Sequence, residues 1–167
     1  MTKTARAHTN IALIKYWGKK DATLRIPLMS SLSMTLDAFY TDTSIEKGTD
    51  TNEFYLNDKK QSFANSQRVF NYIEKLQQRF NLDKENLVIK STNHVPTAAG
   101  LASSSSAFAA LAAAFCAYYH IDADKTLLSR LARIGSGSAS RSVFGGFSIW
   151  QKGDSDETSY AYALDEH

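Results

Sequence analysis

The sequence P-T-A-A-G-L-A-S-S-S-S, residues 96–106, lies directly before an alanine-rich apolar segment that runs from Ala107 to Tyr119. Its side chains are mostly small, Gly100 permits backbone angles that other residues avoid, and the serines supply hydroxyl donors. The apolar segment predicts a buried helix, whose first turn would present unpaired backbone N–H groups and the positive end of the helix dipole. A loop of this kind in front of a helix is typical of a phosphate-binding site.

Two interpretations of residues 96–106 remain open on this stretch alone. It could bind phosphate, or Gly100 and the serines could only form a turn and a helix N-cap. The sequence contains no G-x-x-x-x-G-K-[ST] and no G-x-G-x-x-G after a strand. The loop therefore matches neither of these common nucleotide-binding motifs.

The segments on either side of the loop predict one strand and two further helices. Leu87 to Ile89 reads as a short apolar strand, so the order is strand, loop, helix, which favours the phosphate interpretation. A helix is expected from about Asp124 to Ile134. Apolar residues at spacings of three and four predict an amphipathic helix over Ala64 to Phe80, with Arg68 on its polar face.

The rest of the chain predicts β-structure in a mostly antiparallel sheet. Thr4 to Tyr16 is strand-like and ends in Y-W-G-K-K-D, which we expect at a strand exit or loop. Ser31 to Lys47 alternates polar and larger residues, and Glu53 to Leu56 is expected as its short hairpin partner. Gly145-Gly146 predicts a turn into F-S-I-W-Q, and Tyr160 to Leu164 is the last expected strand.

The composition is that of an ordinary globular domain. The chain has 167 residues, 43% hydrophobic and 22% charged, so one domain is expected over residues 1–167. The net charge of +2 gives no strong field for nucleic acid or anionic lipid. The single cysteine, Cys116, lies in the alanine-rich helix, where burial is expected. No secretory leader or membrane-spanning run is visible, so a cytoplasmic protein is expected.

Two further segments combine small residues with groups that can bind an anion. The first is Tyr16 to Lys19, in which we expect Trp17 to pack as a wall of the pocket. The second is Gly135 to Ser142, which contains small hydroxyl residues and the guanidinium of Arg141. The alternative for the second segment is a flexible connection between helices with a solvated arginine.

At this point the chain resembles the diphosphomevalonate decarboxylases of the GHMP (galactokinase, homoserine, mevalonate, phosphomevalonate) kinase superfamily. The resemblance rests on N-I-A-L-I-K-Y-W-G-K at Asn10 to Lys19, on residues 96–106, and on G-S-G-S-A-S-R-S at Gly135 to Ser142. Related kinases usually have a glycine where this chain has Ala102, and the Y-W-G-K string is similar to that of the decarboxylases. The resemblance implies an α+β fold, the ribosomal protein S5 domain 2-like fold of the GHMP kinase N-terminal domain, with an antiparallel-rich sheet covered by helices.

The resemblance implies an ATP- and Mg²⁺-dependent conversion of mevalonate 5-diphosphate to isopentenyl diphosphate, carbon dioxide, ADP and phosphate. The 3-hydroxyl is phosphorylated and then leaves as carbon dioxide departs. The implied partner is this small-molecule substrate, with no nucleic acid and no membrane, and a homodimer is left open. Two alternatives stand: a GHMP-type kinase for mevalonate or phosphomevalonate that stops at phosphorylation, and a non-catalytic nucleotide-binding fragment.

The resemblance also implies roles for individual residues. The expected substrate-binding residues are Tyr16, Lys19, Ser136, Gly137, Ser138 and Arg141, with Arg141 at the carboxylate. The expected ATP-binding residues are Ser91, Asn93, Gly100, Ala102, Ser103, Ser104, Ser105 and Ser106. Either Ser104 or Ser106 is expected near Mg²⁺, whose preference for oxygen ligands suits a serine hydroxyl beside phosphates.

Family chains are about twice as long, and the aspartate that they place against the 3-hydroxyl lies in their C-terminal half. We therefore expect this chain to be the N-terminal, ATP-binding domain without the family's C-terminal domain, to contain no catalytic residue, and to be inactive alone. None of Asp154, Asp156 and Asp165 matches the family aspartate. The first two lie in D-S-D-E, which is expected to form a solvated turn.

Overall fold

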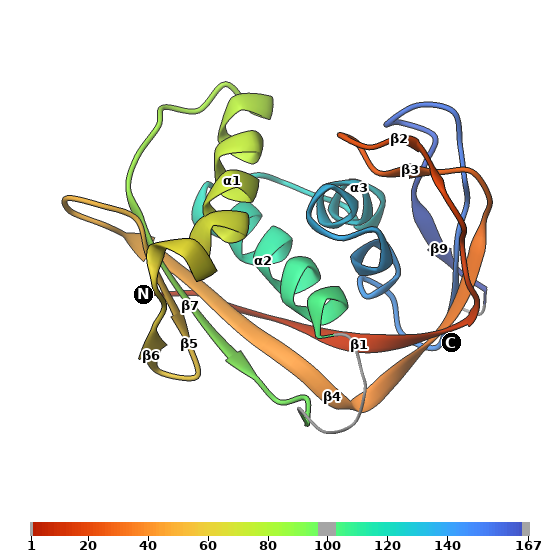
Figure 1. Cartoon of the computed structure of the whole chain (residues 1–167), viewed down its shortest axis with the longest axis horizontal. Coiled ribbons are helices and arrows are strands. Elements are labelled where there is room, and N and C mark those ends of the chain that lie inside the picture. Colours follow the sequence, from red (N-terminus) through yellow and green to blue (C-terminus); the bar gives the residue numbers. More distant parts are fainter. Residues whose placement is uncertain (1, 97–102, 165–167) are drawn as a thin grey trace.

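The computed structural model describes residues 2–96 and 103–164. Within these ranges a curved sheet carries three α-helices on one face, which confirms the expected α+β class (Figure 1). The strands are β1 (Thr4–Ile14), β2 (Lys19–Asp21), β3 (Ile26–Pro27), β4 (Ser31–Lys47), β5 (Glu53–Leu56), β6 (Lys59–Lys60), β7 (Leu87–Asn93), β8 (Phe147–Trp150) and β9 (Ala161–Ala163). The helices are α1 (Phe63–Arg79), α2 (Ser104–Tyr118), α3 (Lys125–Gly135) and the short 3-10 helix η2 (Gly137–Arg141).

Strand β4 is the central strand of the main sheet, whose order is β6-β5-β7-β4-β8-β9. Along one edge of β4, residues 41–47 pair with β7 and residues 31–34 pair with β8, both antiparallel. Strand β1 pairs antiparallel along the opposite edge. The alternation predicted over Ser31 to Lys47 therefore forms one continuous strand of 17 residues. Its length lets it pair with β1 along one edge and with both β7 and β8 along the other.

The predicted partner of Glu53 to Leu56 is wrong. Strand β5 does not pair with β4 in the described structure, because β7 lies between them and pairs parallel with β5. The hairpin partner of β5 is β6, across a turn in which Asn57 and Asp58 have φ values of 50° and 63°. Both residue types tolerate this left-handed conformation, which a two-residue hairpin turn requires.

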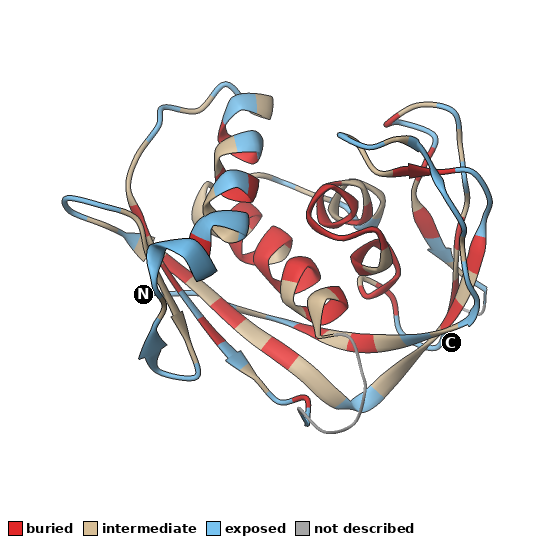
Figure 2. Ribbon diagram, viewed as in Figure 1, coloured by how far each residue is buried: buried red, intermediate tan, exposed pale blue. Residues whose placement is uncertain are grey.

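The hydrophobic core lies between the sheet and the helices. Helix α2 is buried along most of its length, as its alanine-rich sequence predicts and as Figure 2 shows. Phe115 of α2 has no exposed surface, and neither do Leu76 of α1, Leu87 and Ile89 of β7. The other helices begin at capped positions, where the side chains of Ser62 and Asp124 accept hydrogen bonds from backbone N–H groups. The middle motif runs into the start of α2, and the third motif begins where α3 ends.

Two predicted boundaries shift in a way that matters for the site. Helix α2 begins at Ser104 and not at Ala107, so Ser104 lies in the first helical turn. Strand β7 continues past Ile89 to Asn93, so Ser91 and Asn93 lie on a strand and not in a loop. The predicted ATP-binding residues Gly100 and Ala102 lie outside the described residues.

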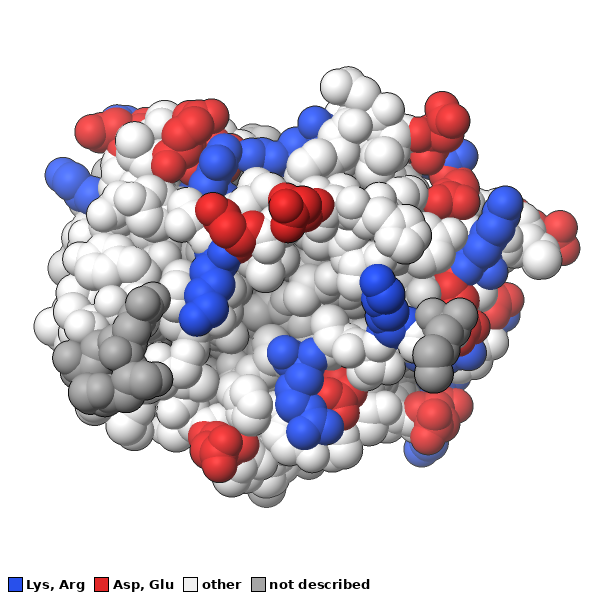
Figure 3. Space-filling model, turned by 180° about the vertical axis from the view of Figure 1, so that it is seen from behind, with Lys and Arg blue, Asp and Glu red and all other residues white. Residues whose placement is uncertain are grey.

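The surface carries charge of both signs. Figure 3 shows basic and acidic side chains interspersed over the face that it draws, consistent with a net charge of +2.

Within the described ranges, no helix combines the length and the apolar character that crossing a membrane requires.

Candidate functional site

The first and third motifs meet where Gly137 packs against Tyr16. A Cβ atom on Gly137 would lie 2.7 Å from Tyr16 Oη and 2.8 Å from the Trp150 ring, closer than a real Cβ approaches other atoms. The rings of Tyr16 and Trp150 themselves pack edge to face, with their centroids 4.7 Å apart. Only glycine fits at position 137. Its close approach to Tyr16 brings two of the predicted substrate-binding residues together.

Asn10 joins β1 to the third motif. Its Nδ2 donates to the Ser138 carbonyl at 2.9 Å and to Ser142 Oγ at 2.7 Å, and its Oδ1 accepts from Arg141 Nη2 at 3.3 Å. The pairing of β1 with β4 shifts register between His8 and Asn10. Sequence reasoning gave Asn10 no role, although an amide directly before the apolar run Ile11 to Ile14 is a signal that could have identified it.

Arg141 is buried, with 2% of its surface exposed. Its Nη1 donates to Ser31 Oγ at 2.5 Å, while its Nε has no hydrogen-bond partner in the structure. Burial lowers the pKa of Arg141 to about 10, so the guanidinium is still charged at neutral pH. No ion pair of Arg141 with a described acidic residue exists. A buried cation with an unused donor points to an anionic ligand.

The burial of Arg141 also decides between the two interpretations of Gly135 to Ser142. The segment forms η2, and Gly137, Ala139, Ser140 and Arg141 are buried within it. The alternative of a flexible connection with a solvated arginine is wrong. The short helix is instead packed into the protein, because α2, α3 and β8 all contact it.

A chain of serine hydroxyls connects the middle motif to the third. Ser136 Oγ donates to Ser104 Oγ at 3.4 Å and lies 3.3 Å from Ser138 Oγ. Ser104 and Ser138 are partly exposed, whereas Ser136 is 7% exposed. A predicted ATP-binding serine therefore lies beside two predicted substrate-binding serines, as transfer of a phosphoryl group between two ligands requires.

Ser105 and Ser106 occupy buried positions at the start of α2, with 1% and 0% of their surface exposed. The Ser106 hydroxyl donates to the Ser103 carbonyl at 3.1 Å and lies 3.2 Å from Thr9 Oγ1 and 2.8 Å from Thr41 Oγ1. These contacts attach α2 to β1 and β4. Ser103 makes no side-chain capping bond, which weighs against a role of the serines as a simple N-cap.

A narrow cavity of about 120 Å³ lies between α2 and the sheet. It brings together three predicted ATP-binding residues, because Ser91, Asn93 and Ser103 all line it. Thr43 and Thr41 hold the first two, with side-chain oxygen distances of 2.8 Å to Ser91 and 3.2 Å to Asn93. The remaining lining residues are Thr41 and the apolar Phe54, Leu56, Val69, Ala107, Phe108 and Leu111.

Sequence reasoning missed a cationic cavity of about 450 Å³ beside the C-terminus of α3. Arg25 Nε donates to the Ile134 carbonyl and Arg68 Nη2 donates to the Gly135 carbonyl, both at 3.0 Å. The sequence suggests only a solvated position for Arg68, on the polar face of α1. No sequence signal could have placed Arg25 beside it, because a turn between two very short strands brings it there.

Lys19 and Trp17 are not drawn into the cluster formed by Tyr16, Gly137 and Arg141. Lys19 is exposed in β2 and forms no ion pair with a described residue. Trp17 is 73% exposed, so the expectation that it packs as a pocket wall is wrong for the described structure. The chain turns away from the core there: β1 ends at Ile14, and Gly18 has a φ of 71°.

The expectation of a solvated turn at the end of the chain is wrong for Asp156. This carboxylate is 9% exposed and accepts hydrogen bonds from Arg79, Arg130 and Arg133. Burial acts to raise its pKa, but the hydrogen bonds from Arg79 and Arg130 outweigh burial and lower it to about 2. Asp154 is solvated as expected, paired with Lys20 at 2.9 Å. Asp165 lies outside the described residues.

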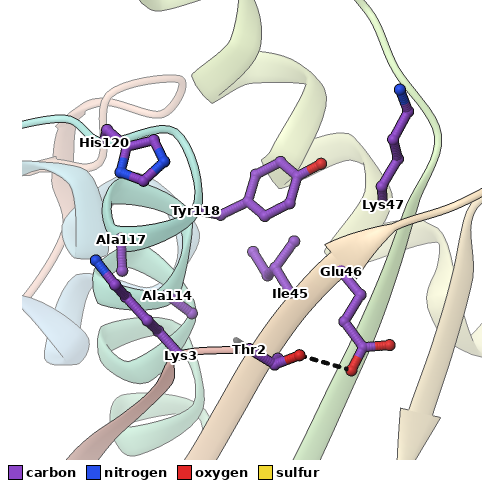
Figure 4. A pocket seen from close by; sticks show the side chains of 9 residues that line it. All are labelled: Thr2, Lys3, Ile45, Glu46, Lys47, Ala114, Ala117, Tyr118 and His120. Atoms are coloured by element: carbon purple, nitrogen blue, oxygen red, sulfur yellow. Dashed lines mark hydrogen bonds between the residues drawn. The ribbon is translucent and has the colours of Figure 1, made fainter.

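Another cavity, of about 330 Å³, lies between the start of β1, the end of β4 and the end of α2 (Figure 4). Its polar residues include Lys3, Glu46 and His120, and Thr2 Oγ1 donates to Glu46 at 3.3 Å. None of its lining residues belongs to the three motifs. In the part of the chain that the structure describes, no group of three or more His, Cys, Asp or Glu side chains could hold a metal ion.

Residues 7–161 match the model of the diphosphomevalonate decarboxylase-like N-terminal domain. The diphosphomevalonate decarboxylase of Ganoderma lucidum is 40% identical over 97% of this chain and 44% of that protein. Among solved structures, mevalonate diphosphate decarboxylase from Enterococcus faecalis superimposes with a TM-score of 0.93 at 47% identity, over 99% of this chain and 52% of that one. A structure of MDDEF in complex with MVAPP, AMPPCP and magnesium has a TM-score of 0.92 at 47% identity, over 99% and 51%. The chain thus spans about half the length of these relatives.

Proposed function

The chain belongs to the diphosphomevalonate decarboxylase family and has the N-terminal fold of GHMP kinases, and on this basis we propose that the protein containing it decarboxylates mevalonate 5-diphosphate. The reaction uses ATP and yields isopentenyl diphosphate, carbon dioxide, ADP and phosphate in the cytoplasm. The observation that carries the proposal is the buried guanidinium of Arg141, which has an unused Nε donor and no acidic partner among the described residues.

Arg141 binds the substrate carboxylate in this proposal. The phosphoryl group of ATP is transferred to the 3-hydroxyl, after which the bond to the carboxylate carbon breaks and its electrons form the double bond as phosphate leaves. A fixed guanidinium orients the carboxylate for this cleavage. Asn10 and Ser31 hold the Arg141 guanidinium in place for the carboxylate.

The substrate diphosphate lies beside η2 and the end of α3. Small residues there, Ser136, Gly137 and Ser138, supply hydroxyl and backbone N–H donors, and Tyr16 bounds this region through its contact with Gly137. The guanidinium of Arg68, which lies next to Gly135, adds a cation on the same side. Lys19 lies exposed on β2 outside the cluster of Tyr16, Gly137 and Arg141, and no described carboxylate pairs with it, so its ammonium is available to the substrate.

ATP occupies the cavity between α2 and the sheet. The apolar walls of the cavity suit the base, while Ser91 and Asn93 offer polar contacts to its edge or to the ribose. The phosphates extend towards the N-terminus of α2, where backbone N–H groups and serine hydroxyls favour anions. The MDDEF complex with AMPPCP and magnesium supports ATP and Mg²⁺ as ligands.

Of the two serines expected near Mg²⁺, Ser104 fits better. The Ser106 hydroxyl is fully buried and used in contacts with Thr9, Thr41 and the Ser103 carbonyl, whereas Ser104 is partly exposed beside Ser136. When bound, Mg²⁺ would neutralise charge on the phosphate oxygens during transfer. We assign no general base to the described residues and place it, as the family resemblance implies, in the C-terminal half of the parent protein.

Carbon dioxide release tests the proposal. The full-length protein, given mevalonate 5-diphosphate carrying a labelled carboxyl group, ATP and Mg²⁺, is expected to release carbon dioxide and ADP in equal amounts. ADP release without carbon dioxide would instead identify a kinase that stops at phosphorylation. Calorimetry of the 167-residue polypeptide with ATP and Mg²⁺, followed by substrate, measures what this part binds alone; we expect weak binding and no turnover.

A further inference from the structure

The cavity beside the end of α3 is lined by cations and by no acidic residue. Arg25, Arg68 and Lys75 contribute its positive charge. The other lining residues are Ala64, Gln67, Asn71, Tyr72, Phe108, Ile134 and Gly135. None of the three cations forms an ion pair with another described residue. A group of cations without acidic partners in a hollow favours an anionic ligand.

The structure fixes Arg25 in this cavity through its backbone. Arg25 lies in the turn between β2 and β3 with a φ of 56°, a conformation that is uncommon for a residue with a side chain. The preceding carbonyl, that of Leu24, accepts from Arg133 Nε at 2.8 Å, and Arg133 has no exposed surface. The half-buried Arg25 side chain then reaches the Ile134 carbonyl. It is therefore held beside the cavity by a buried residue of α3.

The guanidinium groups of Arg25 and Arg68 lie close enough to repel each other. They donate to consecutive carbonyls, those of Ile134 and Gly135, and the Arg68 guanidinium also lies over the Phe108 ring, 4.6 Å from its centroid. Burial lowers the pKa of Arg68, and the charge of Arg25 lowers it further. A multiply charged anion between the two groups would remove this repulsion.

We propose that Arg25 is a substrate-binding residue that contacts the diphosphate of mevalonate 5-diphosphate opposite Arg68. This inference rests on the proposed function and adds to it a residue from the β2–β3 turn. Gly135 lines the cationic cavity, its carbonyl accepts from Arg68, and it directly precedes Ser136, the first residue of the serine-rich segment. A diphosphate can then bridge the two parts, with the arginines on one phosphate and the serines on the other.

The competing explanation is structural, because the Arg25 Nε also caps the C-terminus of α3. Two substitutions separate the roles. Arg25→Ala removes both the cap and the charge, whereas Arg25→Gln removes the charge but keeps an N–H group that can reach the Ile134 carbonyl. Lys20→Ala is the matched control, since Lys20 is a cation of the same hairpin that is paired with Asp154 outside the cavity.

The experiment measures steady-state kinetics of the full-length protein. Both Arg25 variants are expected to raise KM for mevalonate 5-diphosphate roughly 10-fold, with kcat and KM for ATP nearly unchanged, because one charge-assisted contact is lost. Lys20→Ala should behave as wild type. Recovery of the wild-type KM in Arg25→Gln, or an equal rise of KM for ATP, would overturn the inference.

Pyrophosphate binding distinguishes failure of this inference from failure of the proposed function. Calorimetry of the wild type and of Arg25→Ala with inorganic pyrophosphate does not depend on turnover. Weaker pyrophosphate binding by the variant supports the contact, and equal binding overturns it. If the wild type does not decarboxylate the substrate, the proposed function fails, while pyrophosphate still reports whether Arg25 binds this anion. If Arg68→Ala raises KM and Arg25→Ala does not, the function stands and Arg25 has no part in binding.

Discussion

The carboxylate of Asp156 accepts a hydrogen bond from the guanidinium of Arg133, a side chain with no exposed surface. Arg133 also donates to the carbonyls of Leu24 and Ser159. It therefore ties α3 both to the β2–β3 turn and to the segment between β8 and β9. Since α3 leads directly into η2, this buried pair lies behind the candidate site and supports it.

Replacing Asp156 by Asn should destabilise the protein strongly. The substitution leaves Arg133 buried without its counter-charge, and removal of one partner of a buried ion pair costs about 3–5 kcal/mol. Urea unfolding followed by tryptophan fluorescence measures the change. Asp154→Asn is the control, because its pair with Lys20 is exposed and should contribute little. Similar midpoints for the two variants would contradict the structural role given to Asp156.

The lowered pKa of Asp156 predicts how the free energy of unfolding depends on pH. The pKa of Asp156 is about 2 in the folded protein, below its ordinary value of 3.8. A lowered pKa means that the unfolded chain binds the proton more tightly, so the contribution is present above pH 4 and is lost as pH falls towards 2. It amounts to about 2 kcal/mol. Unfolding free energies measured from pH 6 to pH 2 should fall less steeply in Asp156→Asn than in wild type.

Cys116 should react slowly with thiol reagents. It is 4% exposed within α2, and burial raises its pKa to about 11. At pH 8 the thiolate fraction is then roughly 100-fold smaller than for a thiol of ordinary pKa, before any effect of access. Alkylation by iodoacetamide, followed by mass spectrometry, should be slow in buffer and rapid in urea. Equal rates in the two conditions would show that the thiol is accessible.

Much of the fold was predictable because local patterns agree with the final packing. The 3.6-residue periodicity located α1, the alanine-rich run located α2, and the alternation from Ser31 to Lys47 located β4. The pairing of Glu53 to Leu56 was not predictable in this way. Its neighbour β7 follows about 30 residues that contain β6 and α1, and no local pattern in β5 or β7 indicates that the two strands pair.

The residues of the candidate site likewise include some that the sequence predicts and some that it does not. Tyr16, Ser104, Ser136 and Gly137 lie in recognisable motifs, and the structure brings them together. Arg25 and Asp156 could not be assigned from sequence, because Asp156 lies in a polar segment typical of a solvated turn and nothing near Arg25 in sequence indicates its neighbours. Their burial depends on arginines and carbonyls of α1 and α3, which are distant in sequence.

Filling the cavity beneath α2 should weaken nucleotide binding. Ala107 lines this cavity of about 120 Å³, so Ala107→Leu would occupy space that we assign to ATP. In the full-length protein we expect Kd for ATP to rise roughly 10-fold, while binding of mevalonate 5-diphosphate stays the same. Ala113→Leu, a partly exposed position of the same helix that does not line this cavity, is the control. A lower affinity for substrate with unchanged ATP binding would refute the assignment.

We expect Arg141 to contribute to binding of mevalonate 5-diphosphate and not to binding of ATP. Its Nε is one of two buried side-chain donors without a partner among the described residues, the other being Arg130 Nε, and we assign Arg141 to the substrate carboxylate. In the full-length protein, Arg141→Ala should weaken substrate binding roughly 100-fold, since a buried charge pair is lost, and change ATP binding far less. Arg141→Lys keeps the charge but not the planar fork, so an intermediate loss is expected.

Urea unfolding shows whether each variant is folded at the assay temperature. Arg6→Ala, at an exposed arginine paired with Asp42, serves as the control and should alter neither affinity. Equal losses for substrate and ATP in the folded Lys variant would contradict a role at the carboxylate and would assign Arg141 to supporting η2 alone.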